Sequence, residues 1–563
     1  MFENERVNIF LEGGSMKKKI PVFVASTVAM SMMLGACSYQ KDESQANAKG
    51  DSGKSGAKQV INLTEVSEIP TMDTTLASDA ASSKVMNNTM EGLYRLGKGD
   101  KLVPGVAKSH TKSEDGKKYT FKLREDAKWS NGAPVTAKDF VYAWQRAVNP
   151  DTAAKSGYIM LDVKNAEKIN KRELSPDQLG VKAIDDYTLE VELDNPVPYF
   201  LDLTVYPLFF PLNEKYMKEQ GEKFGLEANT TLYNGPFVLN EWKHEQSFQL
   251  KKNPNYWDQK EVKLEEVNFN VVKDTGAAVN LYNTNAIDRV GLSAELVDKY
   301  KGQKDFKTIN DPTVFFLRFN QKNPALANKN IRKAISSAYD RDGIGEVILN
   351  NGSKGAYGLV PSDFVKGPDK QDFRKENGKL SKVDVKEAKK FWEAGKKELG
   401  KDKIELEFLN FDNEESKKIG EYVKGELEKN LPGLTVTIKM QPFAQKLKLE
   451  DSGQFDISFT GWGPDFPDAI TFLDMFITDG SQNKMAYSNA QYDDIIKKAK
   501  QEGSDVKGRW NELLKAEKIL FEDAAIAPVF QRGRSILERE TIKDVYIHKY
   551  GGELSFKWAS VGK

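Results

Sequence analysis

The sequence predicts an α/β protein of several domains. Its 563 residues suffice for two to four domains with substantial cores. Strand-like runs alternate along the chain with amphipathic helical stretches, and this alternation is typical of α/β lobes. The strand-like runs are residues 60–63, 187–193, 267–272, 314–320, 404–410 and 434–440, and the helical stretches are residues 329–349, 386–399, 416–430 and 505–522.

The composition argues against nucleic-acid binding and against metal or cofactor chemistry. The chain has 83 basic and 83 acidic residues, so no excess of positive charge favours nucleic acid. Its three histidines, His110, His244 and His548, lie far apart and lack metal-ligand spacing. The sequence contains no nucleophile elbow, phosphate-binding glycine loop or nucleotide fingerprint. We therefore expect no cofactor, no metal site and no nucleic-acid partner.

An export signal that ends in a lipidated cysteine is predicted near the N-terminus. Three lysines at residues 17–19 precede the apolar residues 20–34. This apolar run is shorter than the roughly 18–20 residues that span a bilayer. Leu-Gly-Ala-Cys at residues 34–37 matches the bacterial lipobox, which predicts lipidation of Cys37, the only cysteine. The alternative is a chance cysteine beside an ordinary signal sequence.

Residues 37–58 are expected to form a tether between this anchor and the folded body. The segment is rich in small and polar residues, so it cannot bury enough apolar surface to fold. A lipid with two acyl chains on Cys37 suffices for stable membrane attachment. Residues 1–36 are then an upstream extension and a signal peptide, with translation expected to begin at Met16. The expected location is the outer face of the bacterial cytoplasmic membrane.

A strand, a turn and a helix are predicted over residues 119–148. Tyr119, Phe121 and Leu123 alternate with polar residues as in a half-buried strand. After a Ser-Asn-Gly turn, Thr136 is placed as a helix N-cap with an acidic residue three positions later. The Asn-Pro pair that follows residue 148 ends the predicted helix.

The stretch over residues 455–468 combines a strand with an unusual turn. Apolar and polar residues alternate up to Thr460, and Gly461-Trp462-Gly463 then interrupts the pattern. Glycine leaves the backbone open to close approach, and Asp465 follows between two prolines. This pattern predicts a receptor for an extended chain with a positively charged end. The alternative is a strand that ends in a buried tryptophan and a turn aspartate.

The sequence resembles the family 5 extracytoplasmic solute-binding proteins, and within them the oligopeptide-binding lipoproteins. The most specific match is Trp-Ser-Asn-Gly-Ala-Pro-Val-Thr-Ala-Lys-Asp-Phe-Val-Tyr-Ala-Trp-Gln-Arg at residues 129–146. The resemblance extends in collinear order over residues 60–560. Its further matches are residues 91–94, 104–107, 234–237, 253–258, 331–335, 339–341, 358–361, 487–489 and 492–493.

This resemblance implies a two-lobed fold of the periplasmic-binding-protein type. The class is type II, in its three-domain peptide-binding form, with the ligand cleft between the lobes. The first domain would be discontinuous and the second would be inserted into it, while the third would face the first across the cleft. The expected ranges are 59–96, 210–312 and 531–563 for the first domain, 97–209 for the second and 313–530 for the third.

The resemblance also implies where a peptide would bind. Asp465 matches the family position that receives the peptide α-ammonium, and the main chain of Gly461 and Gly463 would pair with the peptide. Trp462 would form a wall of a side-chain pocket. Looser alignments add contact positions in other parts of the chain. These are Tyr158, Ser78, Ala80 and Asn483.

One position departs from the family pattern. Phe459 stands where some relatives carry a basic residue that could pair with a ligand carboxylate. The sequence therefore leaves open how the carboxyl end of a peptide is bound, and which peptide length is preferred.

The function that the resemblance implies is capture of oligopeptides for an ABC importer. The expected partners are membrane permease subunits driven by cytoplasmic ATPases, and the expected state is a monomer. Alternatives within the family are binding of a peptide pheromone, a dipeptide, a nickel complex, haem or a sugar. From other classes, a surface chaperone remains open, and so does a hydrolase that uses Asp465 and Asp468 as a carboxylate pair. We expect no enzymatic activity.

Overall fold

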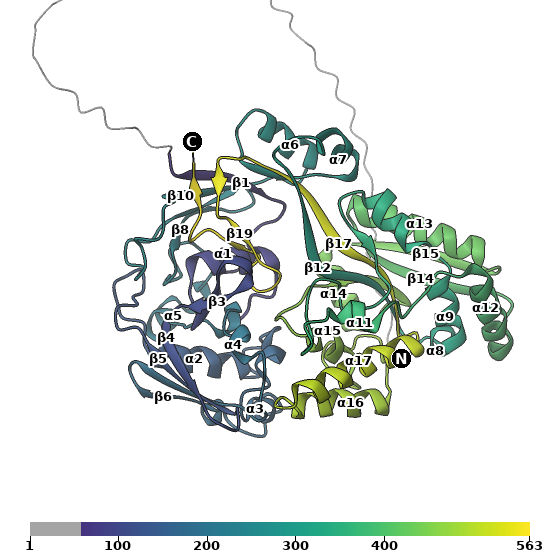
Figure 1. The fold of residues 1–563 in the computed structure, drawn as a ribbon, viewed down its shortest axis with the longest axis horizontal. Helices are drawn as coiled ribbons and strands as arrows, with labels where there is room; N and C mark the ends of the chain where they lie inside the picture. The colour runs from purple at the N-terminus through teal and green to yellow at the C-terminus, as the bar shows by residue number, and fades with distance from the viewer. Residues whose placement is uncertain (1–57, 563) are drawn as a thin grey trace, which may run out of the picture. The chain divides into compact units, whose positions relative to one another are not determined.

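The computed structural model describes residues 58–562, and three larger β-sheets organise this part of the chain (Figure 1). The predicted signal peptide, Cys37 and all of the predicted tether except its last residue lie outside the described residues. No helix within residues 58–562 combines the length and the apolar character needed to cross a bilayer.

The first sheet has the strand order β1-β10-β9-β8, with β1 and β10 parallel and the other pairs antiparallel. It buries Phe237, Leu250 and Val267 against helix α1 (Ala80–Thr89) and neighbouring segments. The predicted strands 60–63 and 267–272 are confirmed as β1 and β10. The strand bounds are Val60–Glu65 for β1, Phe237–Lys243 for β8, Ser247–Lys252 for β9 and Glu266–Val271 for β10.

The second sheet has the order β4-β5-β7-β6 and is antiparallel throughout. Helix α2 (Ala137–Val148) packs on it and begins where the sequence predicted. The carboxylate of Asp139 accepts the backbone N–H of Thr136 at 2.7 Å and its hydroxyl at 3.1 Å, which fixes the first turn. The strand bounds are Ala107–Lys112 for β4, Lys118–Leu123 for β5, Val181–Asp185 for β6 and Thr188–Glu192 for β7.

The third sheet has the order β11-β17-β12-β16-β14-β15, and β13 (Lys354–Gly355) also pairs with β17. Strands β14, β15 and β16 are mutually parallel, whereas β12, β17 and β11 pair in antiparallel fashion. The strand bounds are Arg289–Gly291 for β11, Phe306–Phe319 for β12, Ile404–Phe411 for β14, Leu434–Gln441 for β15, Ile457–Trp462 for β16 and Ile526–Glu538 for β17.

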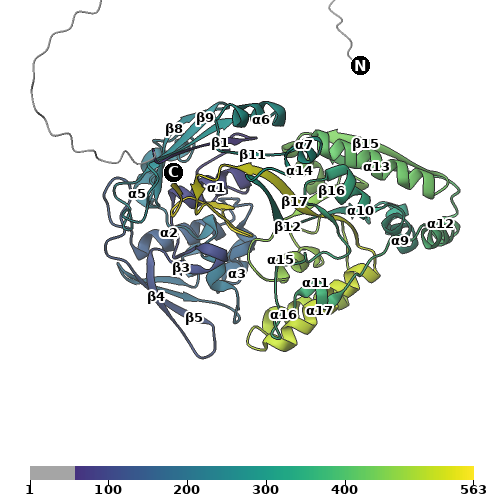
Figure 2. The ribbon, with the colours of Figure 1, turned by 45° about the horizontal axis from the view of Figure 1, so that its top comes forward.

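Strands β12 and β17 are the longest in the described chain and pair with each other from Phe306↔Leu537 to Arg318↔Ile526. At one end β17 pairs with β11, and at the other end β12 pairs with β16. Figures 1 and 2 show the two strands side by side, with α15 near one end, and Figure 2 also labels β11 near the other end. They therefore link β11 at one end of the sheet to β16 through continuous paired backbone.

The main helices around the third sheet agree with the predictions except in one region. The predicted helix over residues 329–349 is interrupted, because α9 ends at Ser337 and helical backbone resumes only at Arg341–Gly343 (α10), followed by a π-helical segment over Ile344–Leu349. Asp340 has an extended backbone and caps the next short helix by accepting the N–H of Asp342 at 3.1 Å. Tyr339 and Arg341, both buried, donate to the carbonyl of Pro528. These tertiary contacts interrupt a pattern that is helical by periodicity alone.

The helices of the described chain other than α1 and α2 vary in length from 3 to 17 residues. The bounds of the longer ones are Lys329–Ser337 for α9, Val385–Leu399 for α12, Glu414–Asn430 for α13, Phe443–Asp451 for α14, Ala490–Gln501 for α16 and Val506–Glu522 for α17. The shorter ones are Ala166–Asn170 (α3), Phe200–Leu203 (α4), Glu214–Gln220 (α5), Thr275–Asn283 (α6), Ala294–Tyr300 (α7), Pro324–Ala327 (α8), Arg341–Gly343 (α10), Phe373–Asn377 (α11) and Ile470–Leu473 (α15).

Short strands complete the described chain. They form three two-stranded sheets, β2 with β3, β18 with β21 and β19 with β20. The bounds are Tyr94–Leu96 (β2), Leu102–Pro104 (β3), Ile542–Lys543 (β18), Tyr546–Ile547 (β19), Leu554–Ser555 (β20) and Ser560–Val561 (β21).

Candidate functional site

Strand β16 leads into the predicted ligand turn, and one of its edges is only partly paired. On one side β12 pairs with it along its whole length, from Phe319↔Ile457 to Val314↔Trp462. On the other side β14 pairs only with Ile457 and Ser458. Within residues 58–562, no strand continues the ladder beside residues 459–462 on that side. Unpaired main-chain groups of this kind can accept an added strand.

The two glycines of the turn have different surroundings. A side chain at Gly461 would lie 2.8 Å from the ring of Phe315, so this position needs glycine because an aromatic ring packs against it. The backbone of Gly461 was expected to be open to a ligand, but the space where its Cβ would lie is filled by Phe315. Gly463 is exposed, and a Cβ there would lie 3.1 Å from Thr313 Oγ1. Close approach from outside is therefore easier at Gly463.

Asp465 lies where two distant segments of the chain meet. The hydroxyl of Tyr158 donates a hydrogen bond to Asp465 Oδ2 at 2.9 Å, across 307 positions of sequence. The side chain is half-buried, and burial raises the pKa of Asp465 to about 7, with a smaller contribution from Asp474 and an opposing one from the Tyr158 bond. The ionised form of Asp465 is therefore destabilised by its surroundings, and a nearby cation would offset this destabilisation.

Tyr206 lies within electrostatic range of Asp465 and of Asp79, the residue between Ser78 and Ala80. Burial raises the pKa of Tyr206, and the charges of Asp465 and Asp79 raise it further. Both aspartates therefore lie near the same phenol, with Asp79 on the segment that starts helix α1. Ser78 and Ala80 on either side of Asp79 are exposed. Sequence reasoning missed Tyr206, since nothing in its local pattern separates it from the buried aromatics around it.

Trp462 and Asn483 differ in whether their polar groups are free to contact a ligand. Trp462 is half-buried, and its indole Nε1 is enclosed without a hydrogen-bond partner among the described residues. The amide of Asn483 instead donates to the carbonyls of Ile477 and Tyr487 at 3.0 and 2.7 Å. Asn483 thus braces its own loop, and the structure gives it no contact with Asp465.

The turn itself is held rigidly. Arg509 of α17 donates to both carboxylate oxygens of Asp468 at 2.8 Å, and Phe466 stacks on Tyr199 with 4.2 Å between ring centroids. The backbone N–H of Asp465 donates to Thr471 Oγ1 at 3.2 Å. Because Arg509 occupies both oxygens of Asp468, this residue is not available as a catalytic partner of Asp465.

No group of three or more His, Cys, Asp or Glu side chains within residues 58–562 could hold a metal ion.

The fold and the candidate site indicate a class of protein, and comparisons with solved structures identify that class. The structure superposes with a TM-score of 0.84 on the substrate-binding domain of an oligopeptide ABC transporter from Bacillus anthracis, at 53% identity over 90% of this chain and 99% of that one. OppA of Listeria monocytogenes bound to peptide gives 0.83 at 45% identity, over 90% and 100% of the two chains. These are two-lobed α/β solute-binding proteins, and this chain has the same type II fold, as the sequence predicted.

The family follows from the sequence comparisons. The model of the bacterial extracellular solute-binding proteins, family 5 (middle part), matches residues 101–484. The dipeptide-binding protein DppE of Bacillus subtilis is 35% identical, over 94% of this chain and 97% of its own length. The chain belongs to the family 5 bacterial extracellular solute-binding proteins. Members of this family act outside the cytoplasm as transport components and are not enzymes.

Proposed function

We propose that this protein captures oligopeptides in the cleft between its lobes and delivers them to the permease of an ABC importer. The observation that carries the proposal is the position of Asp465 next to the open edge of β16. A carboxylate with a raised pKa beside unpaired strand backbone suits a ligand that has an ammonium group at the end of an extended chain. Related proteins named for oligopeptide and dipeptide binding support the same ligand class.

In this proposal the peptide adds a strand beside residues 459–462 and places its amino end at Asp465. Main-chain pairing does not depend on side-chain identity, so peptides of many sequences can bind. The ammonium group takes the place of the Tyr158 hydroxyl at one carboxylate oxygen, and a charge-assisted bond of this kind contributes about 1.5–3 kcal/mol. The pockets that receive peptide side chains, one of them bounded by Trp462, are large in this proposal and contain water.

The proposal includes the domain division and the hinge. Two of the larger sheets fall within single expected domains, β4–β7 within 97–209 and the β1-β10-β9-β8 sheet within 59–96 and 210–312. Residues 531–563 complete the first domain, and residues 313–530 form the third. The paired strands β12 and β17 provide the continuous backbone about which the lobes close.

The proposal also places the protein at the membrane through a lipid on Cys37, as a monomer. Cells fed a labelled fatty acid should yield labelled protein in the membrane fraction. Protein with no label, or protein found wholly in the culture medium, would contradict the anchor.

Calorimetry with purified protein tests peptide capture. Tetra- and pentapeptides with a free amino end should bind, and their N-acetylated forms should bind at least about tenfold more weakly, since acetylation removes the charge that Asp465 pairs with. In a thermal-shift assay, a ligand at a hundredfold its Kd adds about 2.7 kcal/mol of stability. Stabilisation by a dipeptide, cellobiose or a nickel chelate, with no response to oligopeptides, would favour another family ligand. Equal affinity for blocked and free peptides would favour a chaperone.

Peptide affinity should fall in mild acid. Binding requires ionised Asp465, whose pKa is about 7 in the ligand-free protein, and a protonated peptide amine, whose usual pKa is about 7.7–8.0. Below pH 7 the carboxyl group must first lose a proton, so affinity at pH 6 should be roughly sixfold lower than at pH 7.5. Calorimetry across pH 5.5–9 should show a maximum near neutrality. A peptide affinity that stays constant below pH 7 would contradict the assignment of Asp465.

A further inference from the structure

An aromatic contact next to the ligand turn joins residues 97–209 to residues 313–530, which the proposed domain division separates. Phe466, the residue after Asp465, stacks on Tyr199 with 4.2 Å between ring centroids and 11° between ring planes. The side chains of Phe466 and Tyr199 are 6% and 7% exposed, and both belong to a hydrophobic cluster with members from the two segments. Both partners are protein side chains, so the stack does not depend on the chemistry of a ligand.

A lysine of α16 adds an electrostatic contact between the same two segments. Lys500 Nζ lies 3.1 Å from Asp474 Oδ2. Burial lowers the pKa of Lys500, but the charges of Asp474 and Asp162 outweigh it and the net shift is upward. The hydroxyl of Tyr199 donates to Asp162 Oδ2 at 3.2 Å, which ties this carboxylate to the aromatic stack. Lys500 is therefore attracted to a carboxylate of each segment.

Gly503, in the turn after α16, touches the backbone of the other segment. A Cβ at this position would overlap the carbonyl oxygen of Pro196 and would lie 2.7 Å from the carbonyl carbon. Alanine therefore does not fit here unless the two segments shift. The φ of Gly503 is not in the left-handed region, so alanine would be unstrained once the segments are apart. Position 503 thus needs glycine only while the segments touch.

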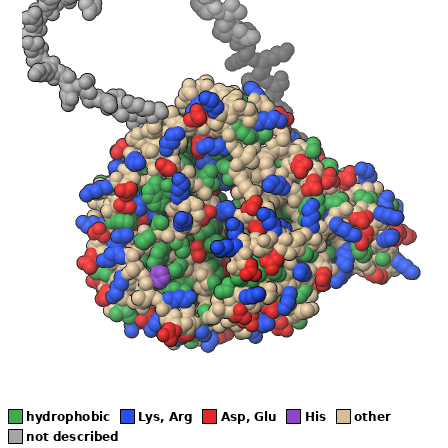
Figure 3. Space-filling model, in the orientation of Figure 1, with side chains coloured by type: hydrophobic (Ala, Val, Ile, Leu, Met, Phe, Trp, Pro, Cys, Tyr) green, Lys and Arg blue, Asp and Glu red, His purple; other side chains and the backbone are tan. Residues whose placement is uncertain are grey.

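A cavity of about 530 Å³ marks a different boundary, between the proposed first and third domains. Its lining comes from β1, β11 and β17 on one side and from α13 on the other. The face shown in Figure 3 is hollowed near its centre, and charged side chains of both signs border the hollow. The residues of the contacts described above are absent from the lining of this cavity. Direct contact and open space therefore occur at separate places.

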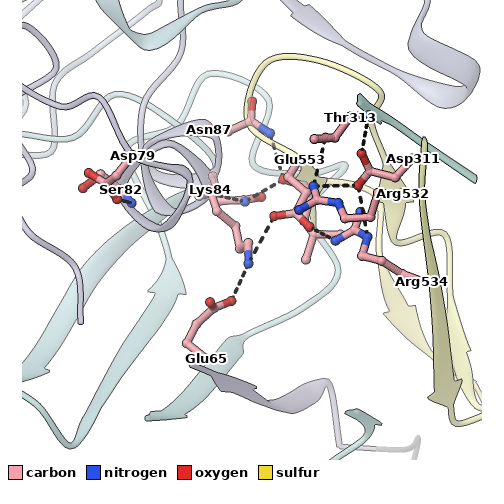
Figure 4. Close-up of polar contacts among 12 residues, drawn as sticks. Glu65, Asp79, Ser82, Lys84, Asn87, Asp311, Thr313, Arg532, Arg534 and Glu553 are labelled. Atoms are coloured by element: carbon pink, nitrogen blue, oxygen red, sulfur yellow. Dashed lines mark hydrogen bonds and ion pairs between the residues drawn. The ribbon is translucent and has the colours of Figure 1, made fainter. Parts of the chain in front are cut away.

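The charged residues beside this cavity pair within the proposed first domain (Figure 4). Two of these pairs hold β12 to β17 where the ladder is irregular, between Asn310 and Val314. A movement of the third domain against the first would leave this series intact, whereas it would break the contacts of Tyr199 and Gly503. The members of the series in order are Glu65, Lys84, Glu553, Arg534, Asp311 and Arg532.

Two structures of MppA differ in their similarity to this chain. The structure of this murein tripeptide binding protein from Escherichia coli superposes with a TM-score of 0.80, at 28% identity over 90% of this chain and 99% of that one. A structure described as the unliganded open form of MppA gives 0.67, at 29% identity over the same shares. The arrangement in which residues 97–209 and 313–530 touch, here called the closed arrangement, thus differs from that open form.

We propose that the Tyr199–Phe466 stack, Lys500 and the Gly503–Pro196 contact form a latch that stabilises the closed arrangement and slows release of a bound peptide. The inference rests on the proposed function, because it takes a peptide as the ligand. Contacts that exist only in the closed arrangement favour it whatever the ligand is. The latch therefore sets how long a peptide stays bound, and it leaves the order of preference among peptides unchanged.

Release of an isotope-labelled tetrapeptide into an excess of unlabelled peptide tests the latch. Release from Gly503→Ala should be at least about fivefold faster than from wild type, because the added Cβ overpacks the closed arrangement. The ratio of affinities for free and N-acetylated peptides should stay at the wild-type value, since Asp465 is unchanged. Gly302→Ala is the matched control, because a Cβ there meets no atom within 4 Å, and it should release peptide at the wild-type rate. Equal release from Gly503→Ala and wild type overturns the inference.

A double-mutant cycle tests the aromatic stack in the same assay. Tyr199→Leu and Phe466→Leu should each speed release, and the double variant should fall short of the product of the single effects by about two- to tenfold. Phe248→Leu is the control, since Phe248 stacks on Phe269 within the first sheet at 4.5 Å between ring centroids. It should lower the melting temperature and leave the release rate unchanged. Single effects that multiply without a shortfall contradict the inference.

Small-angle X-ray scattering without added peptide separates this inference from the proposed function. The radius of gyration of Gly503→Ala should exceed that of wild type, because the added Cβ opposes the closed arrangement, and Gly302→Ala should match wild type. A wild type that binds no peptide contradicts the proposed function, and equal radii in wild type and Gly503→Ala then overturn the latch as well. A wild type that binds peptide but releases it as fast as Gly503→Ala does contradicts only the latch.

Discussion

Replacing Asp465 by Asn should weaken the binding of a free tetrapeptide by about one to two decades, because it removes a charge-assisted bond of about 1.5–3 kcal/mol. The change is nearly isosteric, and Tyr158 can still donate to the amide oxygen, so the fold should be retained. The ratio of affinities for free and N-acetylated peptides should fall close to one. Calorimetry with both peptide forms measures this ratio directly.

Asp465→Asn should also stabilise the ligand-free protein at alkaline pH. The carboxyl pKa is raised from 3.8 to about 7 in the folded protein, so the folded state binds the extra proton between these pH values. The free energy of unfolding therefore falls as pH rises through that window, and ionised Asp465 carries the full cost above pH 7. Asn has no charge and escapes this cost. At pH 8 we expect Asp465→Asn to melt at a higher temperature than the wild type and to bind peptide much more weakly.

Asp474→Asn is the matched control for this experiment. Asp474 is a neighbouring carboxylate that raises the pKa of Asp465. Its removal should lower that pKa, so peptide affinity at pH 6 should increase slightly and the discrimination against N-acetylated peptides should remain. Loss of discrimination in both variants would show that general negative charge, and not Asp465, binds the amino end.

Replacing Arg509 by Ala should lower the stability of the protein by about 3–5 kcal/mol, because it leaves Asp468 unpaired in a mostly buried position. The side chains of Arg509 and Asp468 are 7% and 15% exposed and share two hydrogen bonds of 2.8 Å. For a body of about 500 residues, this corresponds to a fall in Tm of about 3–5 °C if it unfolds as one unit. Peptide affinity should fall as well, since the pair fixes the turn that carries Asp465.

An exposed ion pair provides the control for Arg509→Ala. Arg172 and Asp151 lie 2.8 Å apart, but their side chains are 64% and 72% exposed. Arg172→Ala should change the stability by less than about 1 kcal/mol and leave peptide binding unaltered. Melting curves and calorimetry on both variants check the pair of expectations. An equal loss of stability in the two variants would contradict the account of the turn.

The α/β class and most of the elements could be predicted from local pattern. Helix α2 begins at its predicted capping box, and β14 and β15 lie within one residue of their predicted ends. Alternation and capping are encoded in neighbouring residues, so they are visible without the fold. The exception is the region after α9. There the periodicity continues, but buried contacts of Tyr339 and Arg341 with Pro528 break the helix.

The candidate site was only partly accessible to sequence reasoning. Asp465 was predicted from its position between prolines after a glycine turn and from the family resemblance, and its assignment stays a prediction. The reason for glycine at position 461 could not be found in this way, because Phe315 lies far away in sequence. The nearness of Tyr206 to both Asp465 and Asp79 likewise depends on segments that only the tertiary structure brings together.

The sequence by itself determined the family and the α/β fold, because both depend on residues that lie close together in the chain or on a collinear series of motifs. Only the tertiary structure decided which strand edge stays unpaired and which groups surround Asp465. It also decided that the hydroxyl of Tyr158 donates to Asp465. Strand pairing, burial and the electrostatic environment of a carboxylate are set by contacts between distant segments, and local sequence does not contain them.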